Sequence, residues 1–393
     1  MSVLDVMKAQ SESMTQYRRW LHHHAELAWE EFETTEFIEN KLREAGIQPY
    51  RYGDRTGCGA MIRGGKAGEN AKTILLRAVI DAMPGHDKKN LPYSSKNPGA
   101  VHSCGHDGHV TMLLHAAKYL NSIKDELPGN VKLIFEAAEE GRGGAKYYVS
   151  QGLMEDVDAV FGIHMWDCME ENHISIESGP VLSCFNRFKI TVHGYSNITS
   201  APHMSKDAIM AAAKVVENLD LLETHMIDPQ EPLVIAVGTI HGGSAANSYC
   251  DEVVLEGTIR TFSKTFMETM EEKITDVVDH SVKMLGCTAD VEIVRGAPAV
   301  IHGDEKLNQL TRNAAVKLMG EDVLRSAKPC LASDTFAYYS EHVPGVFAFL
   351  GTVNEEKGFT APLHNDDYNL DECVLPTGAA LFAQVAMDYL SEQ

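Results

Sequence analysis

Hydrophobic and polar positions in the first half of the chain follow patterns of helices and strands in turn. Apolar residues at helical spacing predict helices, and short apolar runs bounded by turn residues predict buried strands. The helices expected on this basis are 5–24, 30–45, 107–123 and 143–151. The buried strands expected are 73–80, 131–136 and 159–164. Such alternation predicts an α/β sheet whose functional groups lie at the carboxyl ends of the strands.

The pattern changes from about residue 186. Strands are expected over 187–193, 233–240, 250–260 and 289–294, and helices over 207–224 and 266–285. This β-α-β-β-α-β order predicts a compact ferredoxin-like α+β unit. Because the first kind of pattern resumes after about residue 298, we expect a catalytic domain made of 1–185 and 298–393. The small domain, 186–297, would be inserted into it.

Composition indicates a globular protein with more than one domain. The chain has 393 residues, of which 44% are hydrophobic and 23% charged, and this length favours two domains. The formal net charge of -22 argues against nucleic acid or a membrane surface as a partner and leaves a small-molecule substrate. Unpaired cysteine spacing, the lack of a signal-peptide pattern and the lack of a long apolar run predict a cytoplasmic protein.

One short segment concentrates metal-binding side chains. Residues 102–109 read His-Ser-Cys-Gly-His-Asp-Gly-His and precede or begin an expected helix. Glu139 and Glu140 follow one expected strand, His164 ends another, and His364 lies near the end of the chain. Thiolate, imidazole and carboxylate groups together suit Zn²⁺, Mn²⁺, Co²⁺ or Ni²⁺. An adjacent second glutamate could act as a base toward a metal-bound water, so the pattern predicts a metal hydrolase site.

Several separate motifs stand in the order of one known family. They are RRWLH at 18–22, DAMP at 81–84, HSCGHDGH at 102–109, FEAAEEG at 135–141, FGIH at 161–164, GTIR at 257–260 and PLHN at 362–365. In these motifs the chain resembles the M20 metallopeptidases, most closely the amidohydrolase branch with hippurate hydrolases, N-acyl-amino-acid amidohydrolases and auxin-conjugate hydrolases. The resemblance implies a mixed-sheet α/β catalytic domain of the phosphorylase/hydrolase-like type. It also implies that the inserted ferredoxin-like domain acts as a lid and dimerisation unit.

Carried over residue by residue, the resemblance implies a site for two divalent metal ions. Its ligands would be Cys104, His106, Glu140, His164 and His364. Glu139 would be the general base that takes a proton from a bridging water and passes it to the leaving nitrogen. Asp81 would fix a ligand histidine. Asn247 and Arg260, on strands of the inserted domain, would meet a substrate carboxylate, and the protein would form a homodimer or a higher homo-oligomer.

Three places depart from the family's pattern. The first aspartate of an Asp-x-Asp-Ala-Leu-Pro run is Val79 here, and a Ser-Glu-Asp-Phe segment appears as Ser-Asp-Thr-Phe at 333–336. A histidine of the inserted domain, which in the family helps polarise the scissile carbonyl, often across the dimer, is Ile198. Losing one such donor typically costs about 10²–10³ in rate. Ile198 would then line the acyl or aryl pocket, and His203, another nearby polar side chain or an arginine would replace the donor.

Three functions are compatible with these residues. The leading one is a dinuclear metal-dependent amidohydrolase of a small N-acyl amino acid or a related carboxylate-bearing amide. The second, motivated by Ile198 and Val79, is an aminohydrolase that releases ammonia from a substituted aromatic amine on the same metal scaffold. The third is a catalytically inactive ligand-binding homologue, against which the intact ligand set and base argue. The sequence leaves the metal and the substrate open.

Overall fold

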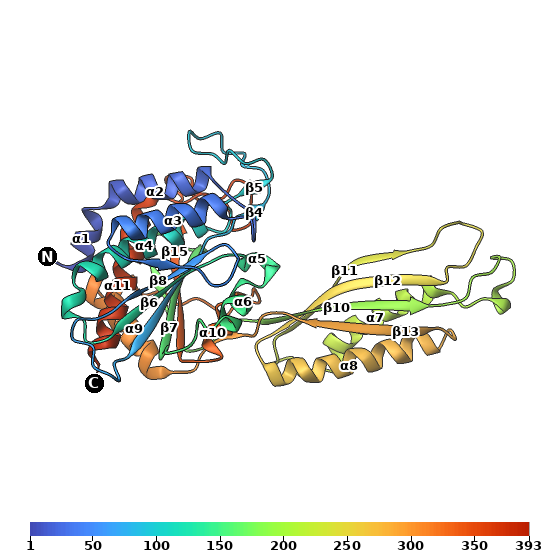
Figure 1. Cartoon of the computed structure of the whole chain (residues 1–393). Coiled ribbons are helices and arrows are strands. Elements are labelled where there is room, and N and C mark those ends of the chain that lie inside the picture. The colour runs from blue at the N-terminus through green and yellow to red at the C-terminus, as the bar shows by residue number, and fades with distance from the viewer. Residues whose placement is uncertain (393) are drawn as a thin grey trace. The chain divides into compact units, whose positions relative to one another are not determined.

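The structure is a computed structural model that describes residues 1–392, and these residues form two compact units. Unit 1 comprises Met1–Gly179, Ile301–Lys328 and Thr335–Gln393, and unit 2 comprises Pro180–Val300 and Pro329–Asp334 (Figure 1). Unit 2 is thus an insertion into the chain of unit 1. The strands β9 (Gly179–Leu182) and β14 (Val300–His302) carry the chain from one unit to the other.

Unit 1 is built on a seven-stranded mixed sheet with the order β1-β2-β6-β3-β7-β15-β8. Its strands are β1 (Pro49–Tyr50), β2 (Cys58–Ile62), β3 (Thr73–Val79), β6 (Asn130–Glu136), β7 (Ala159–Glu170), β8 (Ile174–Ser175) and β15 (Gly345–Val353). The central strands β6, β3, β7 and β15 pair in parallel, and the outer pairs are antiparallel. Every residue of β3 is buried, as is typical of a parallel strand covered on both faces. The predicted mixed α/β fold is confirmed.

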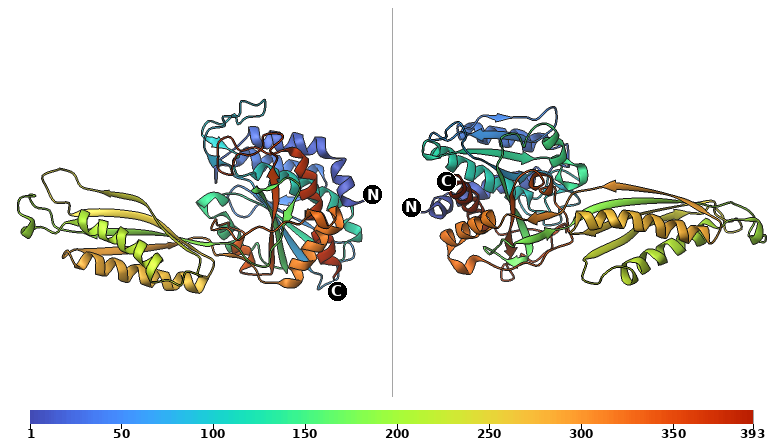
Figure 2. Two further views of the ribbon diagram at one scale, coloured as in Figure 1. Left: turned by 180° about the vertical axis from the view of Figure 1, so that it is seen from behind. Right: turned by 90° about the horizontal axis from the view of Figure 1, so that it is seen from below.

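Helices cover this sheet (Figure 2). They are α1 (Val3–Lys8), α2 (Ser11–His23), α3 (Phe32–Glu44), α4 (His106–Ser122), α5 (Glu139–Arg142), α6 (Gly144–Ser150), α9 (Glu305–Met319), α10 (Ala337–Ser340) and α11 (Leu375–Ser391), with short 3-10 helices η1 (Lys124–Glu126), η3 (Glu321–Val323) and η4 (Glu372–Val374). The helix expected over 5–24 is two helices, because the chain turns at Ala9 and Gln10. Helices α4 and α11 pack on each other and on β3 and β7, and the short pair β4 (Met83–Pro84) and β5 (Ala100–Val101) precedes α4.

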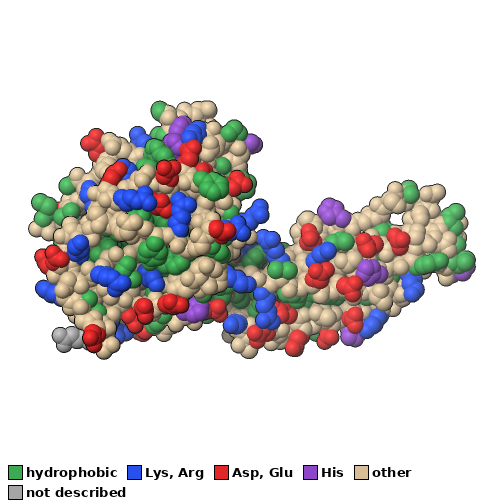
Figure 3. Space-filling view, in the orientation of Figure 1, with side chains coloured by type: hydrophobic (Ala, Val, Ile, Leu, Met, Phe, Trp, Pro, Cys, Tyr) green, Lys and Arg blue, Asp and Glu red, His purple; other side chains and the backbone are tan. Residues whose placement is uncertain are grey.

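One stretch of unit 1 is long and apolar enough to cross a membrane, by length and composition only. It is Glu372–Ser391, and 78% of its apolar window is buried inside the structure. This burial identifies α11 as a core helix of the unit. Acidic and basic side chains are interspersed on the face of unit 1 that Figure 3 shows.

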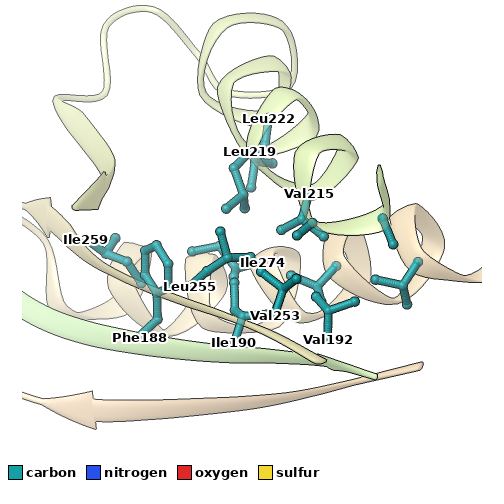
Figure 4. Packing of buried hydrophobic residues seen from close by; sticks show 14 of the residues in the cluster. Phe188, Ile190, Val192, Val215, Leu219, Leu222, Val253, Leu255, Ile259 and Ile274 are labelled. Carbon is teal, nitrogen blue, oxygen red and sulfur yellow. The ribbon is translucent and has the colours of Figure 1, made fainter. Parts of the chain in front are cut away.

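Unit 2 has the predicted ferredoxin-like order. Its elements are β10 (Cys184–His193), η2 (Pro202–Met204), α7 (Ala208–His225), β11 (Leu233–Gly242), β12 (Glu252–Thr261), α8 (Lys264–Lys283) and β13 (Thr288–Arg295). The sheet is antiparallel with the order β11-β12-β10-β13. Buried and less buried residues alternate along β10, as expected of a sheet with one covered face. Phe188, Ile190 and Val192 pack on that face under Val215 and Leu219 of α7 (Figure 4).

Candidate metal centre

A sharp turn between β5 and α4 presents two of the predicted ligands. Gly105 is the N-cap of α4 with φ 78°, a left-handed conformation that favours glycine. A Cβ at this position would lie 2.9 Å from Cβ of Met165, so any side chain would also clash. The turn places Cys104 and His106 on either side of Gly105, and both are buried.

The remaining ligands come from the parallel sheet and from the loop before η4. Glu139 and Glu140 follow β6 through Ala138, which has φ 57°, and residues held in this region often lie at functional sites. His164 lies midway along β7, which extends to Glu170 and not only to residue 164 as expected. His364 has φ 65° and donates its backbone N–H to the carbonyl of Ser103 at 2.8 Å.

The five predicted ligands converge in unit 1. The Sγ atom of Cys104 lies 3.3 Å from Nε2 of His364 and 3.6 Å from Nε2 of His164. Oε1 of Glu140 lies 3.5 Å from Nε2 of His364 and 3.9 Å from Nε2 of His106. These ligands and Glu139 form three groups in which one donor atom from each residue lies within 4.8 Å of the others: Cys104, His106 and His164; Cys104, Glu140 and His364; and His106, Glu139 and Glu140.

Hydrogen bonds on the far side of two imidazole rings turn their lone pairs inward. Nδ1 of His106 donates to the carbonyl of Asp81 at 2.8 Å, and Nδ1 of His164 donates to the carbonyl of Met165 at 2.6 Å. A carbonyl only accepts, so in the neutral rings Nε2 carries the lone pair, the form that binds metals. Nε2 of His106 and Oε1 of Glu140 are buried without a hydrogen-bond partner. Facing acceptors of this kind are costly unless a cation lies between them, so the donor set fits divalent metal ions.

The environment of Glu140 leads to the same conclusion. Burial raises the pKa of Glu140, and the charge of Asp81 adds to the rise, while His106 and His364 oppose it. A bound cation favours the ionised form of a nearby carboxylate. A cation bound here would therefore offset the cost of burying the carboxylate of Glu140.

Asp81 lies beside both a ligand histidine and a ligand glutamate. Its Oδ2 accepts the N–H of Glu140 at 2.9 Å, and its Oδ1 lies 3.3 Å from Nδ1 of His106. The hydrogen bond from His106 goes to the backbone carbonyl of Asp81. The geometry thus places Asp81 next to two of the predicted ligands, and its role remains a prediction.

A buried charge pair that was not predicted from the sequence is linked to Glu139 through Thr335. Nε of Arg77 donates to Oε2 of Glu136 at 2.7 Å, and both residues are buried. Val79 pairs with Glu136 in the register of β3 and β6, so an aspartate at position 79 would put a second buried carboxylate next to Glu136. The available signal was a charged residue, Arg77, inside the apolar run 73–80, because a buried charge needs a partner.

Glu31 was also missed as a supporting residue. It is fully buried, and its carboxylate accepts the N–H of Ala138 at 2.8 Å and the hydroxyl of Thr56. Burial, with the charge of Asp81, raises the pKa of Glu31 to about 7. Glu31 thereby holds the left-handed residue that precedes Glu139.

The four predicted substrate residues lie in unit 2, in two separate places. We call residues 195–204 and 243–249 the tip of unit 2; it contains Ile198, His203 and Asn247, all exposed. Asn247 was expected on a strand, but it lies in the turn between β11 and β12 because the segment 243–249 lacks alternating apolar residues. Arg260 lies near the other end of β12, eight residues beyond Glu252, or about 26 Å at roughly 3.3 Å per residue.

Arg260 is half-buried with its guanidinium only partly satisfied. Nη1 donates to the carbonyl of Leu331 at 2.9 Å, and the guanidinium carbon lies 4.7 Å from the centre of the Phe185 ring. Within the described part of the chain, no carboxylate forms an ion pair with it. This arrangement could accept an anion.

Comparisons with known proteins cover nearly the whole chain. The model of Peptidase family M20/M25/M40 matches residues 75–388. N-acetyl-L-cysteine deacetylase of Bacillus subtilis is 35% identical over 91% of this chain and 83% of that protein. IAA-amino acid hydrolase ILR1-like 4 of Arabidopsis thaliana is 34% identical over 96% and 86%, respectively.

Solved structures agree with these relatives. A candidate aminohydrolase from methicillin-resistant Staphylococcus aureus has a TM-score of 0.92 and 30% identity and covers 99% of each chain. A dinuclear metal-binding peptidase of the M20 family from Bacillus subtilis has a TM-score of 0.85 and 30% identity, covering 98% of this chain and 99% of that one. The likeness to the latter supports two divalent metal ions as cofactors. The predicted family and the predicted enzyme class are confirmed, and the chain belongs to peptidase family M20/M25/M40 as a hydrolase of C–N bonds.

Proposed function

We propose that the protein is a dinuclear metal-dependent amidohydrolase that cleaves a small N-acyl amino acid or a related carboxylate-bearing amide. The observation that carries this proposal is the convergence of five metal-binding side chains with Glu139 beside them. The names of two relatives, an N-acetyl-L-cysteine deacetylase and an IAA-amino acid hydrolase, support an acylated amino acid as substrate.

In this proposal the residues of unit 1 have two roles in hydrolysis, metal binding and proton transfer. Cys104, His106, Glu140, His164 and His364 would hold the cations. Two divalent cations supply Lewis-acid polarisation of the amide carbonyl and lower the pKa of water. Glu139 accepts a proton from the attacking water and delivers it to the amide nitrogen. The water oxygen bonds to the carbonyl carbon, the C–N bond breaks, and a carboxylic acid and an amine leave.

Arg260 is proposed to bind the substrate carboxylate, because a guanidinium can hold a carboxylate with two parallel hydrogen bonds. Asn247 and Ile198 lie at the tip, at the opposite end of β12 from Arg260. One small substrate therefore cannot contact both Arg260 and the tip of the same copy of unit 2. We therefore propose that the tip serves the site of a second copy in a homodimer.

Two surface features of unit 2 support this homodimer. Strand β11 is at the edge of its sheet and is mostly exposed, and an open edge is a template for pairing with another chain. Ile209, Met210 and Leu221 of the adjacent α7 are each nearly half exposed, at 49%, 48% and 47%. Light scattering coupled to size-exclusion chromatography tests the dimer, and a monomer at all concentrations would contradict it.

An aminohydrolase remains the second candidate because Ile198 offers no hydrogen-bond donor to an amide carbonyl. Ile198 is 56% exposed at the tip of unit 2, where apolar side chains gather (Figure 3). A reaction that forms no carbonyl oxyanion does not need that donor. Ammonia and a hydroxylated product would identify this activity.

The test is a mass-spectrometric screen of protein loaded with Mn²⁺, Zn²⁺, Co²⁺ or Ni²⁺, using N-acyl amino acids, dipeptides and substituted aminobenzoates. Acid plus amine supports the amidohydrolase. Glu139→Gln should lower kcat by about 10²–10⁴-fold, whereas Glu126→Gln, at an exposed glutamate of unit 1, should change it less than about twofold. Full activity in Glu139→Gln would refute the assigned base.

We also propose that the protein works in the cytoplasm. In the described part of the chain no disulfide joins any of the eight cysteines. Such usage is typical of a reducing compartment. Fractionation of the source cells tests this assignment, and recovery outside the cytoplasm would contradict it.

A further inference from the structure

The carboxylate of Glu139 is held by a residue far away in the sequence. The backbone N–H of Thr335 donates to Oε1 of Glu139 at 3.1 Å. Glu139 follows the left-handed residue Ala138 and is only half-buried. A donor from outside its own loop therefore restricts where its carboxylate points.

Thr335 is itself anchored to the buried charge pair. Its hydroxyl donates to Oε1 of Glu136 at 2.7 Å and accepts from Nη2 of Arg77 at 2.8 Å. Tyr339 donates to the other oxygen of Glu136 at 3.0 Å. Hydrogen bonds to charged groups are stronger and shorter than neutral ones, so the backbone at residue 335 is fixed by two such bonds.

We propose that Thr335 is a positioning residue for Glu139. Its hydroxyl fixes the backbone on the Arg77–Glu136 pair, and the fixed N–H orients the carboxylate of Glu139. The inference rests on the proposed function, since it matters only if Glu139 transfers the proton. A displacement of about 1 Å in a reacting group can cost about 10²-fold in rate, so the hydrogen bonds of Thr335 to Glu136, Arg77 and Glu139 control turnover.

Three variants separate positioning from general stability. Thr335→Val removes the hydroxyl and keeps the shape, Thr335→Ser keeps the hydroxyl, and Tyr339→Phe removes a different hydrogen bond to the same Glu136. We expect Thr335→Val to lower kcat by about 10–10²-fold with KM within about threefold. Thr335→Ser should restore kcat to within about threefold of the wild type. Tyr339→Phe should lower the melting temperature about as much as Thr335→Val but keep kcat within about threefold.

The outcomes distinguish this inference from the proposed function. If Glu139→Gln retains kcat, the proposed function fails. If Glu139→Gln is inactive while Thr335→Val keeps full kcat, only the positioning role is overturned. Equal losses of kcat in Thr335→Val and Tyr339→Phe would also overturn it, because they would indicate a structural effect.

A measurement without turnover tests the contact directly and needs no change at residue 335. In Glu139→Ala the N–H of Thr335 loses its acceptor. Its amide hydrogen should therefore exchange several-fold faster than in the wild type, an increase that corresponds to the loss of one hydrogen bond. Hydrogen exchange of the peptide that contains Thr335, read by mass spectrometry on metal-free protein, gives this rate. Unchanged exchange in Glu139→Ala would overturn the inference.

Discussion

Replacing Glu31 with glutamine should make the stability of unit 1 less dependent on pH. The pKa of Glu31 is raised from 4.5 to about 7, chiefly by burial and further by the charge of Asp81. The folded state therefore holds this proton more tightly than the unfolded chain does. The stabilisation from Glu31 is fully present below about pH 4.5 and is lost as the pH rises through about 7. Glutamine keeps the shape and one acceptor oxygen and has no proton to lose.

The size of the effect follows from the shift in pKa. A rise from 4.5 to about 7 corresponds to roughly 3 kcal/mol, at about 1.4 kcal/mol for each unit. The wild type should lose up to that amount from this group between about pH 4.5 and pH 8, and Glu31→Gln should lose none of it. The cost of altering the bonds to Thr56 and Ala138, about 1 kcal/mol each, is the same at both pH values. Bound cations would stabilise the carboxylate, so the protein should be metal-free.

Tryptophan fluorescence during urea unfolding gives the free energy of the relevant unit. All three tryptophans, Trp20, Trp29 and Trp166, belong to unit 1. The free energy of unfolding is compared at about pH 5 and about pH 8 for the wild type and Glu31→Gln. If the difference between the two pH values is the same in both proteins, Glu31 does not carry this proton and the reasoning is refuted.

Three further substitutions test other parts of the structure. Gly105→Ala should destabilise unit 1 by about 1–3 kcal/mol, because of its positive φ and the contact with Met165; wild-type stability in urea unfolding would contradict this. Arg260→Ala should raise KM about 10–10²-fold for a carboxylate-bearing amide but not for its methyl ester, and equal effects on both would rule out carboxylate binding. Val79→Asp should destabilise by about 2–4 kcal/mol, and adding Glu136→Gln should recover part of this loss; a loss unchanged by the second substitution would exclude charge repulsion.

Apolar periodicity was sufficient to predict most of the elements because each element buries one face or the whole strand. It failed where apolar spacing continues through a change of direction. The positions Leu4, Met7 and Met14 are all buried, so the pattern shows no interruption at Ala9 and Gln10, where α1 and α2 separate. Apolar spacing indicates which residues are buried, but it does not show where one helix ends and the next begins.

The metal-binding donors could be predicted because thiolate, imidazole and carboxylate groups are unusual together and stand at fixed motif positions. Their supports could not, because these depend on the register of strands. Arg77 and Glu136 lie 59 residues apart in the sequence, and only the parallel pairing of β3 with β6 brings them together. Thr335 and Glu139 are 196 residues apart, and their contact uses the backbone N–H of Thr335. Because nearly every residue has a backbone N–H, the residue type does not reveal such a donor.

The register also relates two of the departures from the family's pattern to each other. Where that pattern has aspartates, this chain has the uncharged residues Val79 and Thr335, and both lie next to Glu136, one by strand register and the other by a hydrogen bond. Glu136 already pairs with the buried guanidinium of Arg77 at 2.7 Å. A buried carboxylate without a positive partner is costly, so one arginine can balance one carboxylate here but not three. Uncharged residues at positions 79 and 335 therefore leave Arg77 and Glu136 as a balanced pair, and neither position is one of the predicted metal ligands.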